Sequence, residues 1–314
     1  MAGTDAYFQK NKKKEKWRRI LPFYILALPG IIYLLINNYI PIYGMVIAFK
    51  KFNIQKGIFG SDWYGLKNFE FLFKTNDAWI ITRNTICYNI VFFIVGTFLA
   101  VTLAILLNEL KGKIYSKICQ SLTLLPFLMS WVVVSYLGYA FLSSESGLIN
   151  KSILEPLGLE KMNWYQEIKY WPYILVLINA WKGVGYSMII YLSSIVGINQ
   201  DYYEAALIDG SNKWQQITKI TLPLLKPTVL TLLILSLGQI FRSDFGLFYQ
   251  IPRNSGALFP VTRTLDVYVY QALMKNSNYG MSSAASVYQS VVCFICLVGA
   301  NLVIKKYRPE SALF

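Results

Sequence analysis

Eight side chains with hydrogen-bonding groups or aromatic faces lie within or at the ends of long apolar runs. A charged group inside a membrane helix is costly, so such groups usually face a cavity or a partner group. Planar hydrogen-bonding groups, charges and aromatic rings in these places could line a path for a polar solute. The eight residues are Asn179, Trp181, Lys182, Tyr186, Gln239, Arg242, Asp244 and Tyr288.

The charged members of this set also have a structural interpretation. Arg242 could pair with Asp244, or its long side chain could extend to the membrane surface. Lys182 could extend to the surface in the same way. The sequence leaves both interpretations open.

The composition is that of a membrane protein. Of 314 residues, 55% are hydrophobic and only 15% are charged, against roughly 25% charged residues in soluble domains. The net charge of +14 is spread over a tail and loops, without the basic helix typical of nucleic-acid binding, so we expect no nucleic-acid partner. The chain has no histidine, and Cys293 and Cys296 lie in an apolar run. We therefore expect packing cysteines and no metal site.

Six apolar runs are long enough to cross a membrane as helices. A hydrocarbon core of roughly 30 Å needs about 20 helical residues. We expect membrane helices at about 21–47, 84–108, 118–142, 171–196, 224–248 and 283–304. The predicted fold is an all-α membrane protein with six transmembrane helices.

Basic residues predict the orientation of these helices. Lysine and arginine concentrate in a tail at 1–19 and again just after the last run, and such residues favour the cytoplasmic side. With six spans both ends are cytoplasmic, so we expect a basic tail at 1–19, a transmembrane domain at 20–305 and a second tail at 306–314. The loop at 197–227 is then also cytoplasmic.

This loop contains a helix–turn–helix pattern between Tyr203 and Pro227. Good helix formers lead to Asp209-Gly210, where glycine suits the left-handed turn that ends a helix. Asn212 can cap a second helix, with Gln215 at the reciprocal position. The sequence therefore predicts a helical hairpin on the cytoplasmic side.

The second helix of the hairpin has one apolar edge, since apolar residues recur at three- and four-residue steps. They are Trp214, Ile217, Ile220 and Leu224. Such an edge suits docking into a groove of a partner protein. An ordinary loop packed on its own domain would show the same pattern, and both interpretations stay open.

The residue types of the hairpin follow a fixed spacing. Glu-Ala-Ala is followed after three residues by glycine, and after nine more by Ile-x-Leu-Pro: Glu204, Ala205, Ala206, Gly210, Ile220, Leu222 and Pro223. This spacing resembles the EAA loop of ABC importer permeases. Asp209 and Pro227 resemble the carbohydrate-uptake branch of that family, and the chain is similar to its polysaccharide-type permeases.

The resemblance implies the type I importer fold and a set of partners. These are a second homologous permease, two cytoplasmic ABC ATPase subunits that use ATP and Mg²⁺, a lipid-anchored or periplasmic sugar-binding protein, and the lipids of a bacterial-type plasma membrane. It implies that the eight polar residues lie on a sugar path. It also implies a set of residues that couple to the ATPase: Glu204, Ala205, Ala206, Asp209, Gly210, Trp214, Ile217, Ile220 and Pro223.

Two other classes of function remain as alternatives. The chain has no G-x4-GK[ST] loop, so we expect ATP hydrolysis and its cofactors in a partner rather than in this chain. A channel or secondary transporter would need no docking hairpin. A membrane-embedded glycosyl or phosphoryl transferase would need clustered carboxylates, whereas the acidic residues here are scattered.

Overall fold

The computed structural model describes residues 2–110, 112–275, 277–307 and 312. Most of the expected C-terminal tail, namely 308–311, 313 and 314, lies outside these residues, as does Met1. The expected N-terminal tail forms the start of a helix that continues across position 19 without a break.

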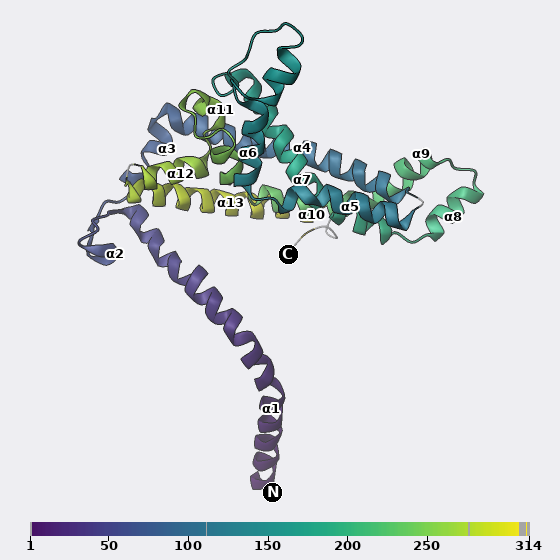
Figure 1. Cartoon of the computed structure of the whole chain (residues 1–314). Coiled ribbons are helices and arrows are strands. Elements are labelled where there is room, and N and C mark those ends of the chain that lie inside the picture. Colours follow the sequence, from purple (N-terminus) through teal and green to yellow (C-terminus); the bar gives the residue numbers. More distant parts are fainter. Residues whose placement is uncertain (1, 111, 276, 308–311, 313–314) are drawn as a thin grey trace.

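The described chain is almost entirely helical (Figure 1). The longer helices are α1 (Ala2–Leu34), α4 (Asn76–Asn108), α5 (Lys113–Leu128), α6 (Trp131–Leu142), α7 (Trp171–Val196), α8 (Asp201–Ile208), α10 (Leu222–Leu237), α12 (Leu265–Met274) and α13 (Tyr279–Tyr307). The four-residue helices are α2 (Gly57–Gly60), α3 (Phe71–Lys74), α9 (Lys213–Gln216) and α11 (Phe259–Thr262).

Short segments with tighter or wider turns extend or connect these helices. Wider π turns lie at Leu35–Tyr39, Asn150–Leu154, Ile217–Thr221 and Gly246–Gln250. Tighter 3-10 turns lie at Ile40–Phe49, Lys67–Phe69, Ile168–Tyr170 and Gly256–Leu258. Strands β1 (Lys50–Lys51) and β2 (Asp62–Trp63) form a small antiparallel ribbon.

Five continuous helical segments of the described chain are long and apolar enough to cross a membrane. They are Arg19–Phe49, Asn76–Asn108, Ile168–Val196, Lys213–Leu237 and Tyr279–Tyr307. A sixth results if the bent pair α5 and α6 is counted as one span. The all-helical membrane fold is therefore confirmed, although two of the six expected spans are not continuous helices.

The third expected span, 118–142, is broken in the middle. Helices α5 and α6 meet at an angle of 94°. Met129 and Ser130 adopt extended backbone conformations between them, and Ser130 Oγ accepts a hydrogen bond from Val133 N (3.3 Å). Pro126 also removes one backbone donor from the end of α5. A helix stop and an N-cap inside an apolar run therefore replace the straight span that we predicted.

The fifth expected span, 224–248, ends early. Helix α10 stops at Leu237, and the residues at 238–244 form a turn and an irregular segment before a new helical turn. Gly238 lies close to α13, since a Cβ atom there would be 2.7 Å from Leu297 Cδ1. The same span begins earlier than predicted, because one helix runs from Lys213 to Leu237. The wider turn before Pro223 accommodates the proline without ending this helix.

The helices pack around a core formed mainly by α4 and α7, the most extensive helix pair of the described residues. Helix α5 contacts α7 at Gly185, where a Cβ atom would lie 2.1 Å from Thr123 O. A residue without a side chain is thus required for the two backbones to approach this closely. Helices α8 and α9 project at one end of the long helices, and α3, α11 and α12 lie toward the other (Figure 1).

Helix α1 leaves this core as an arm (Figure 1). In the most apolar window of Arg19–Phe49, 0% of the residues are buried. Its large apolar side chains, such as Phe23 and Leu26, are exposed. The segment at Ile40–Phe49 packs on the body, mainly against α13.

Candidate functional site

The predicted hairpin is present, and its turn has the expected geometry. Helix α8 ends at Ile208, and Gly210 adopts φ +80°. Ser211 N donates to Ala206 O (2.9 Å), and Gly210 N donates to Leu207 O (3.0 Å). This pair of bonds is the Schellman ending of a helix, which satisfies carbonyls that the helix leaves free.

The second helix of the hairpin begins as predicted. Asn212 Oδ1 accepts from Gln215 N, and Gln215 Oε1 accepts from Asn212 N, both at 2.9 Å. Helix α9 then continues through Ile217–Thr221 into α10. The hairpin is therefore continuous with a membrane-spanning helix.

Three polar contacts hold the hairpin, two of them within it and one to the end of α4. Tyr203 Oη lies 2.9 Å from Thr221 Oγ1 and joins the two helices at their base. Lys213 Nζ forms an ion pair with Glu109 Oε2 (3.0 Å), just beyond the end of α4. Gln216 is buried and donates to Ser211 Oγ (3.4 Å). The hairpin thus has a defined position relative to α4 and α10.

The hairpin exposes several large apolar side chains. Trp214 is 72% exposed and Ile208 is 87% exposed, and Leu207 and Tyr202 are exposed beside Ile208 on α8. Glu204 and Ala205 are also exposed, whereas Ala206, Ile217, Ile220 and Pro223 are half-buried. A hollow of about 300 Å³ lies between the two helices, lined in part by Asp209, Gly210 and Ile220. Sequence reasoning found Trp214 but not the exposed apolar end of α8.

Lys182 is held by backbone carbonyl groups at the end of α5. Its Nζ atom donates to the carbonyl oxygens of Phe127 and Met129 (both 2.8 Å) and Pro126 (3.3 Å). The side chain is only 8% exposed. Lys182 therefore does not extend to the membrane surface. It caps the C-terminal end of α5, where free carbonyls attract a cation.

Asp244 caps the other broken span. Its Oδ1 atom accepts from Gly246 N (2.9 Å) and Leu247 N (3.3 Å), at the start of the new helical turn. Its Oδ2 atom accepts from Trp131 Nε1 (2.8 Å). Arg242 is exposed, and it takes part in none of the ion pairs found among the described residues.

Side chains from three other helices satisfy the irregular backbone at 238–244. Asn89 Nδ2 of α4 donates to Ile240 O (3.0 Å) and Arg242 O (2.7 Å). Gln289 Nε2 of α13 donates to Phe241 O (2.6 Å). Asp266 Oδ2 of α12 accepts from Ser243 N (2.6 Å). Such satisfaction is a requirement for non-helical backbone at membrane depth.

The eight predicted path residues lie at several places in the described chain. Lys182 and Asp244 lie around the break between α5 and α6, and beside it Tyr186 stacks on Phe127 with ring centroids 4.9 Å apart. Tyr288 packs edge-on against Phe241 at the other break (6.0 Å). Gln239 and Arg242 are exposed there, Asn179 is half-buried on α7, and Trp181 lines an apolar hollow of about 490 Å³ between α6 and α7.

Sequence reasoning missed Asn89, Trp131 and Asp266. Asn89 lies in an apolar run, so the cost of burying a polar group was an available signal. Trp131 and Asp266 gave no signal, because their partners are remote in the sequence.

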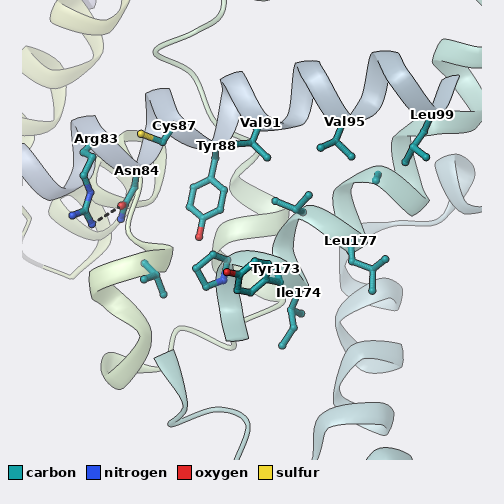
Figure 2. A pocket seen from close by; sticks show the side chains of 14 residues that line it. Arg83, Asn84, Cys87, Tyr88, Val91, Val95, Leu99, Tyr173, Ile174 and Leu177 are labelled. Atoms are coloured by element: carbon teal, nitrogen blue, oxygen red, sulfur yellow. Dashed lines mark hydrogen bonds between the residues drawn. The ribbon is translucent and has the colours of Figure 1, made fainter. Parts of the chain in front are cut away.

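A mostly apolar groove of about 810 Å³ runs between α4 and α7. Figure 2 shows Tyr88, Val91, Val95 and Leu99 of α4 on one side and Tyr173, Ile174 and Leu177 of α7 on the other. Arg83 and Asn84 lie at one end, hydrogen-bonded to each other (3.1 Å). This groove was not predicted.

Known proteins resemble the chain over nearly its whole length. It is 34% identical to the polygalacturonan/rhamnogalacturonan transport system permease protein YteP of Bacillus subtilis (strain 168), over 97% of this chain and 95% of that protein. It is 30% identical to Protein LplB of the same organism, over 99% of this chain and 95% of that protein.

Solved structures agree with these relatives. The fold matches a chain of a bacterial ABC transporter involved in the import of the acidic polysaccharide alginate, with a TM-score of 0.84 and 29% identity over 95% of this chain and 99% of that one. A second match is to the bacterial alginate ABC transporter in complex with alginate pentasaccharide-bound periplasmic protein (TM-score 0.83, 29% identity, 93% and 97% coverage).

Residues 81–309 match the family described as the binding-protein-dependent transport system inner membrane component. This match covers well over half of the chain. The hairpin described above carries the EAA spacing, and the helices are those of a multi-pass membrane protein. The protein therefore belongs to this family and is a membrane-embedded permease subunit of an ABC importer.

Proposed function

We propose that this permease subunit imports a sugar or oligosaccharide that an external binding protein delivers. YteP and both structural neighbours above are named for the transport of polysaccharides. The observation that carries the proposal is the group of large apolar side chains that the hairpin exposes, because exposed apolar side chains that gather on one element support a binding site for another protein.

The partner at this face is a cytoplasmic ABC ATPase, which binds and hydrolyses ATP with Mg²⁺. Trp214 and Ile208 would enter its groove, with Glu204 beside them, while Gly210 sets the angle between the two helices. Of the remaining coupling residues named from the sequence, Ala205 and Asp209 are exposed as well, whereas Ala206, Ile217, Ile220 and Pro223 are half-buried and support the hairpin. Two such ATPases would serve one importer, one for each permease.

A second, homologous permease completes the pore in this proposal. Helix α1 extends away from the core, and its exposed apolar side chains need lipid or protein around them. The apolar groove between α4 and α7 offers a surface on which a helix of the second permease can pack. Lipids fill the surface that this partner leaves free.

The substrate path runs past the exposed polar and aromatic residues of the two broken spans. The stacked rings of Phe127 and Tyr186 present a face for the C–H surface of a sugar, and both side chains are exposed. Asn179, Trp181, Gln239, Arg242 and Tyr288 would supply hydrogen bonds and further ring surfaces along this path. Lys182 and Asp244 would shape the path through the backbone that they cap.

The orientation in this proposal places the tail at 1–19 and the end at 306–314 in the cytoplasm, with 20–305 in the membrane. The last turn of α13 carries Lys305 and Lys306, which supports this side for the C-terminal end. The binding protein, whether lipid-anchored or periplasmic, then docks on the opposite side. In this proposal the segment at 143–170 and α11 lie on that outer side.

Reconstitution tests the function. The permease pair, the ATPase and the binding protein are placed in liposomes, and uptake of labelled oligosaccharides is measured with and without ATP. We expect uptake only with ATP and the binding protein. Uptake of uronate-containing oligosaccharides is compared with uptake of neutral oligosaccharides of equal length, which shows whether the substrate is acidic or neutral. Uptake that persists without ATP would instead support a channel or a secondary transporter.

A labelling experiment tests the side of the hairpin. Trp214→Cys is made in a background that lacks the four native cysteines, and a membrane-impermeant maleimide is applied to intact cells and to inverted vesicles. We expect reaction only in inverted vesicles. Reaction only in intact cells would place the hairpin outside the cell and rule out its contact with a cytoplasmic ATPase.

A further inference from the structure

The two broken spans meet through one tryptophan. Trp131 is the first residue of α6, directly after the break at Met129 and Ser130. Its Nε1 atom donates to Asp244 Oδ2 (2.8 Å), at the break that follows α10. The face of its indole ring lies 5.0 Å from Lys182 Nζ. One side chain therefore contacts the caps of both broken helices.

The contacts of Lys182 leave it no spare hydrogen-bond donor. A lysine ammonium has three N–H donors, and three carbonyl oxygens at the end of α5 accept from Lys182. The nearby rings of Trp131 and Phe127 lie over the charge, at 5.0 and 5.6 Å. A sugar hydroxyl would have to displace one of these partners to bind here.

The packing at Gly246 fixes how the breaks approach each other. A Cβ atom at Gly246 would lie 2.2 Å from Trp131 Cγ, so a larger residue would push the indole ring away from Asp244. Beyond this point, Ser135 Oγ of α6 donates to Gln250 O (2.6 Å). The outer segment at 245–250 is thus attached to α6.

The segment before Asp244 is attached to different helices. Asn89, Asp266 and Gln289 bind the backbone at 240–243 and belong to α4, α12 and α13. Asp244 therefore lies at the boundary between two groups of contacts. Trp131 lies at the matching boundary between α5, which packs on α7, and α6, which packs on 245–250.

The geometry points to a role for Lys182, Trp131 and Asp244 as positioning residues that join the two breaks, so that the inner helices α5 and α10 move together. We call these three residues the pivot cluster. Helix α10 is continuous with the hairpin, so a displacement of the hairpin travels along one helix to Leu237 and then through the irregular segment at 238–244 to Asp244. Trp131 transmits it to the end of α5. This role rests on the proposed function, since it assumes an ATPase at the hairpin.

The test uses the complete reconstituted importer and two variants that each remove one side of the same hydrogen bond. Trp131→Phe deletes the Nε1 donor and keeps a ring over Lys182. Asp244→Asn keeps an oxygen for Gly246 N and removes the charge that Trp131 contacts. The double variant carries both changes. Trp79→Phe, at a highly exposed tryptophan of α4, is the matched control.

We expect each single variant to raise ATP hydrolysis in the absence of loaded binding protein by about fivefold, and to lower uptake per ATP by a similar factor. The double variant should equal either single variant, because both remove one contact. The KM for loaded binding protein, the yield of complex and the control should match the wild type.

Unchanged ratios of hydrolysis to uptake, or additive effects in the double variant, would overturn the inference. An effect on the KM for loaded binding protein alone would assign these residues to a binding step and overturn the inference as well. A wild-type complex without ATP-dependent uptake would contradict the proposed function instead, so the two failures are distinguishable.

Discussion

Lys213, the first residue of α9, forms an ion pair with Glu109, the residue that follows α4, with Nζ and Oε2 3.0 Å apart. The Lys213 side chain is 69% exposed and that of Glu109 is 38% exposed, so solvent screens the pair and it adds little stability. The ion pair instead helps to set the position of the hairpin. The hairpin is joined to the end of the helix that forms the core with α7, as well as to α10.

The first prediction concerns the turn of the hairpin. Gly210 has φ +80°, and no atom lies within 4 Å of a Cβ added there. Gly210→Val should therefore act through backbone strain of about 1–2 kcal/mol and not through a clash. We expect it to uncouple ATP hydrolysis from uptake and to weaken co-purification of the ATPase.

Gly210→Asn is the matched control, because asparagine tolerates the left-handed conformation. It should retain most of the coupling. Equal effects of valine and asparagine would show that the turn conformation is not what the ATPase requires.

The second prediction concerns the charge of Glu204. This residue is exposed in the first turn of α8, where a negative charge is favourable. Glu204→Lys should lower the affinity for the ATPase by about tenfold or more, because it reverses a charge within the docking face. Binding of the purified ATPase to the permease in nanodiscs measures this.

Glu204→Gln should have a smaller effect, and Glu160→Lys in the segment at 143–170 should have none. Wild-type affinity of Glu204→Lys would remove Glu204 from the coupling set.

The third prediction concerns the cap of α5. Lys182→Met keeps the approximate length of the side chain and removes the ammonium group that donates to three carbonyl oxygens. A buried polar group without a partner costs about 1–3 kcal/mol, so the melting temperature of the purified complex should fall clearly. Lys226→Met, at an exposed position of α10, serves as the control and should change little.

Lys182→Arg should recover part of the stability, since it restores donors and the charge. A Lys182→Met complex as stable as the wild type would show that the carbonyl groups find other partners, and that the cap is dispensable.

The fourth prediction compares two glycines of α7. A Cβ at Gly185 would lie 2.1 Å from Thr123 O, whereas one at Gly183 meets no atom within 4 Å. Gly185→Ala should separate α5 from α7 and destabilise the protein by about 1–3 kcal/mol. Gly183→Ala should be neutral, or stabilising by up to about 1 kcal/mol. Thermal unfolding of both variants in detergent gives the comparison, and equal midpoints would contradict it.

The sequence predicted the hairpin well because its determinants are local. The left-handed glycine at 210 and the reciprocal bonds of Asn212 and Gln215 involve residues within a few positions of each other. Hydropathy likewise located the membrane helices, since each needs a long apolar run.

The broken spans could not be predicted in this way. Hydropathy records the composition of a run, whereas the breaks at Ser130 and 238–244 depend on which side chains form hydrogen bonds with the free backbone groups. Lys182 caps carbonyls more than 50 positions earlier in the chain, and Asn89 reaches carbonyls about 150 positions later. The sequence therefore identified the candidate path residues by their residue types, but their individual contacts could be seen only in the folded structure.

The uninterrupted helix from Lys213 to Leu237 has a mechanical consequence. Its 25 residues form a rod about 37 Å long at 1.5 Å per residue. A tilt of about 10° at the hairpin end of such a rod moves its far end by about 6 Å, which is comparable to the width of a sugar ring. A modest rotation imposed by nucleotide binding would thus be amplified, by lever length alone, into a displacement large enough to open or close a passage for a saccharide.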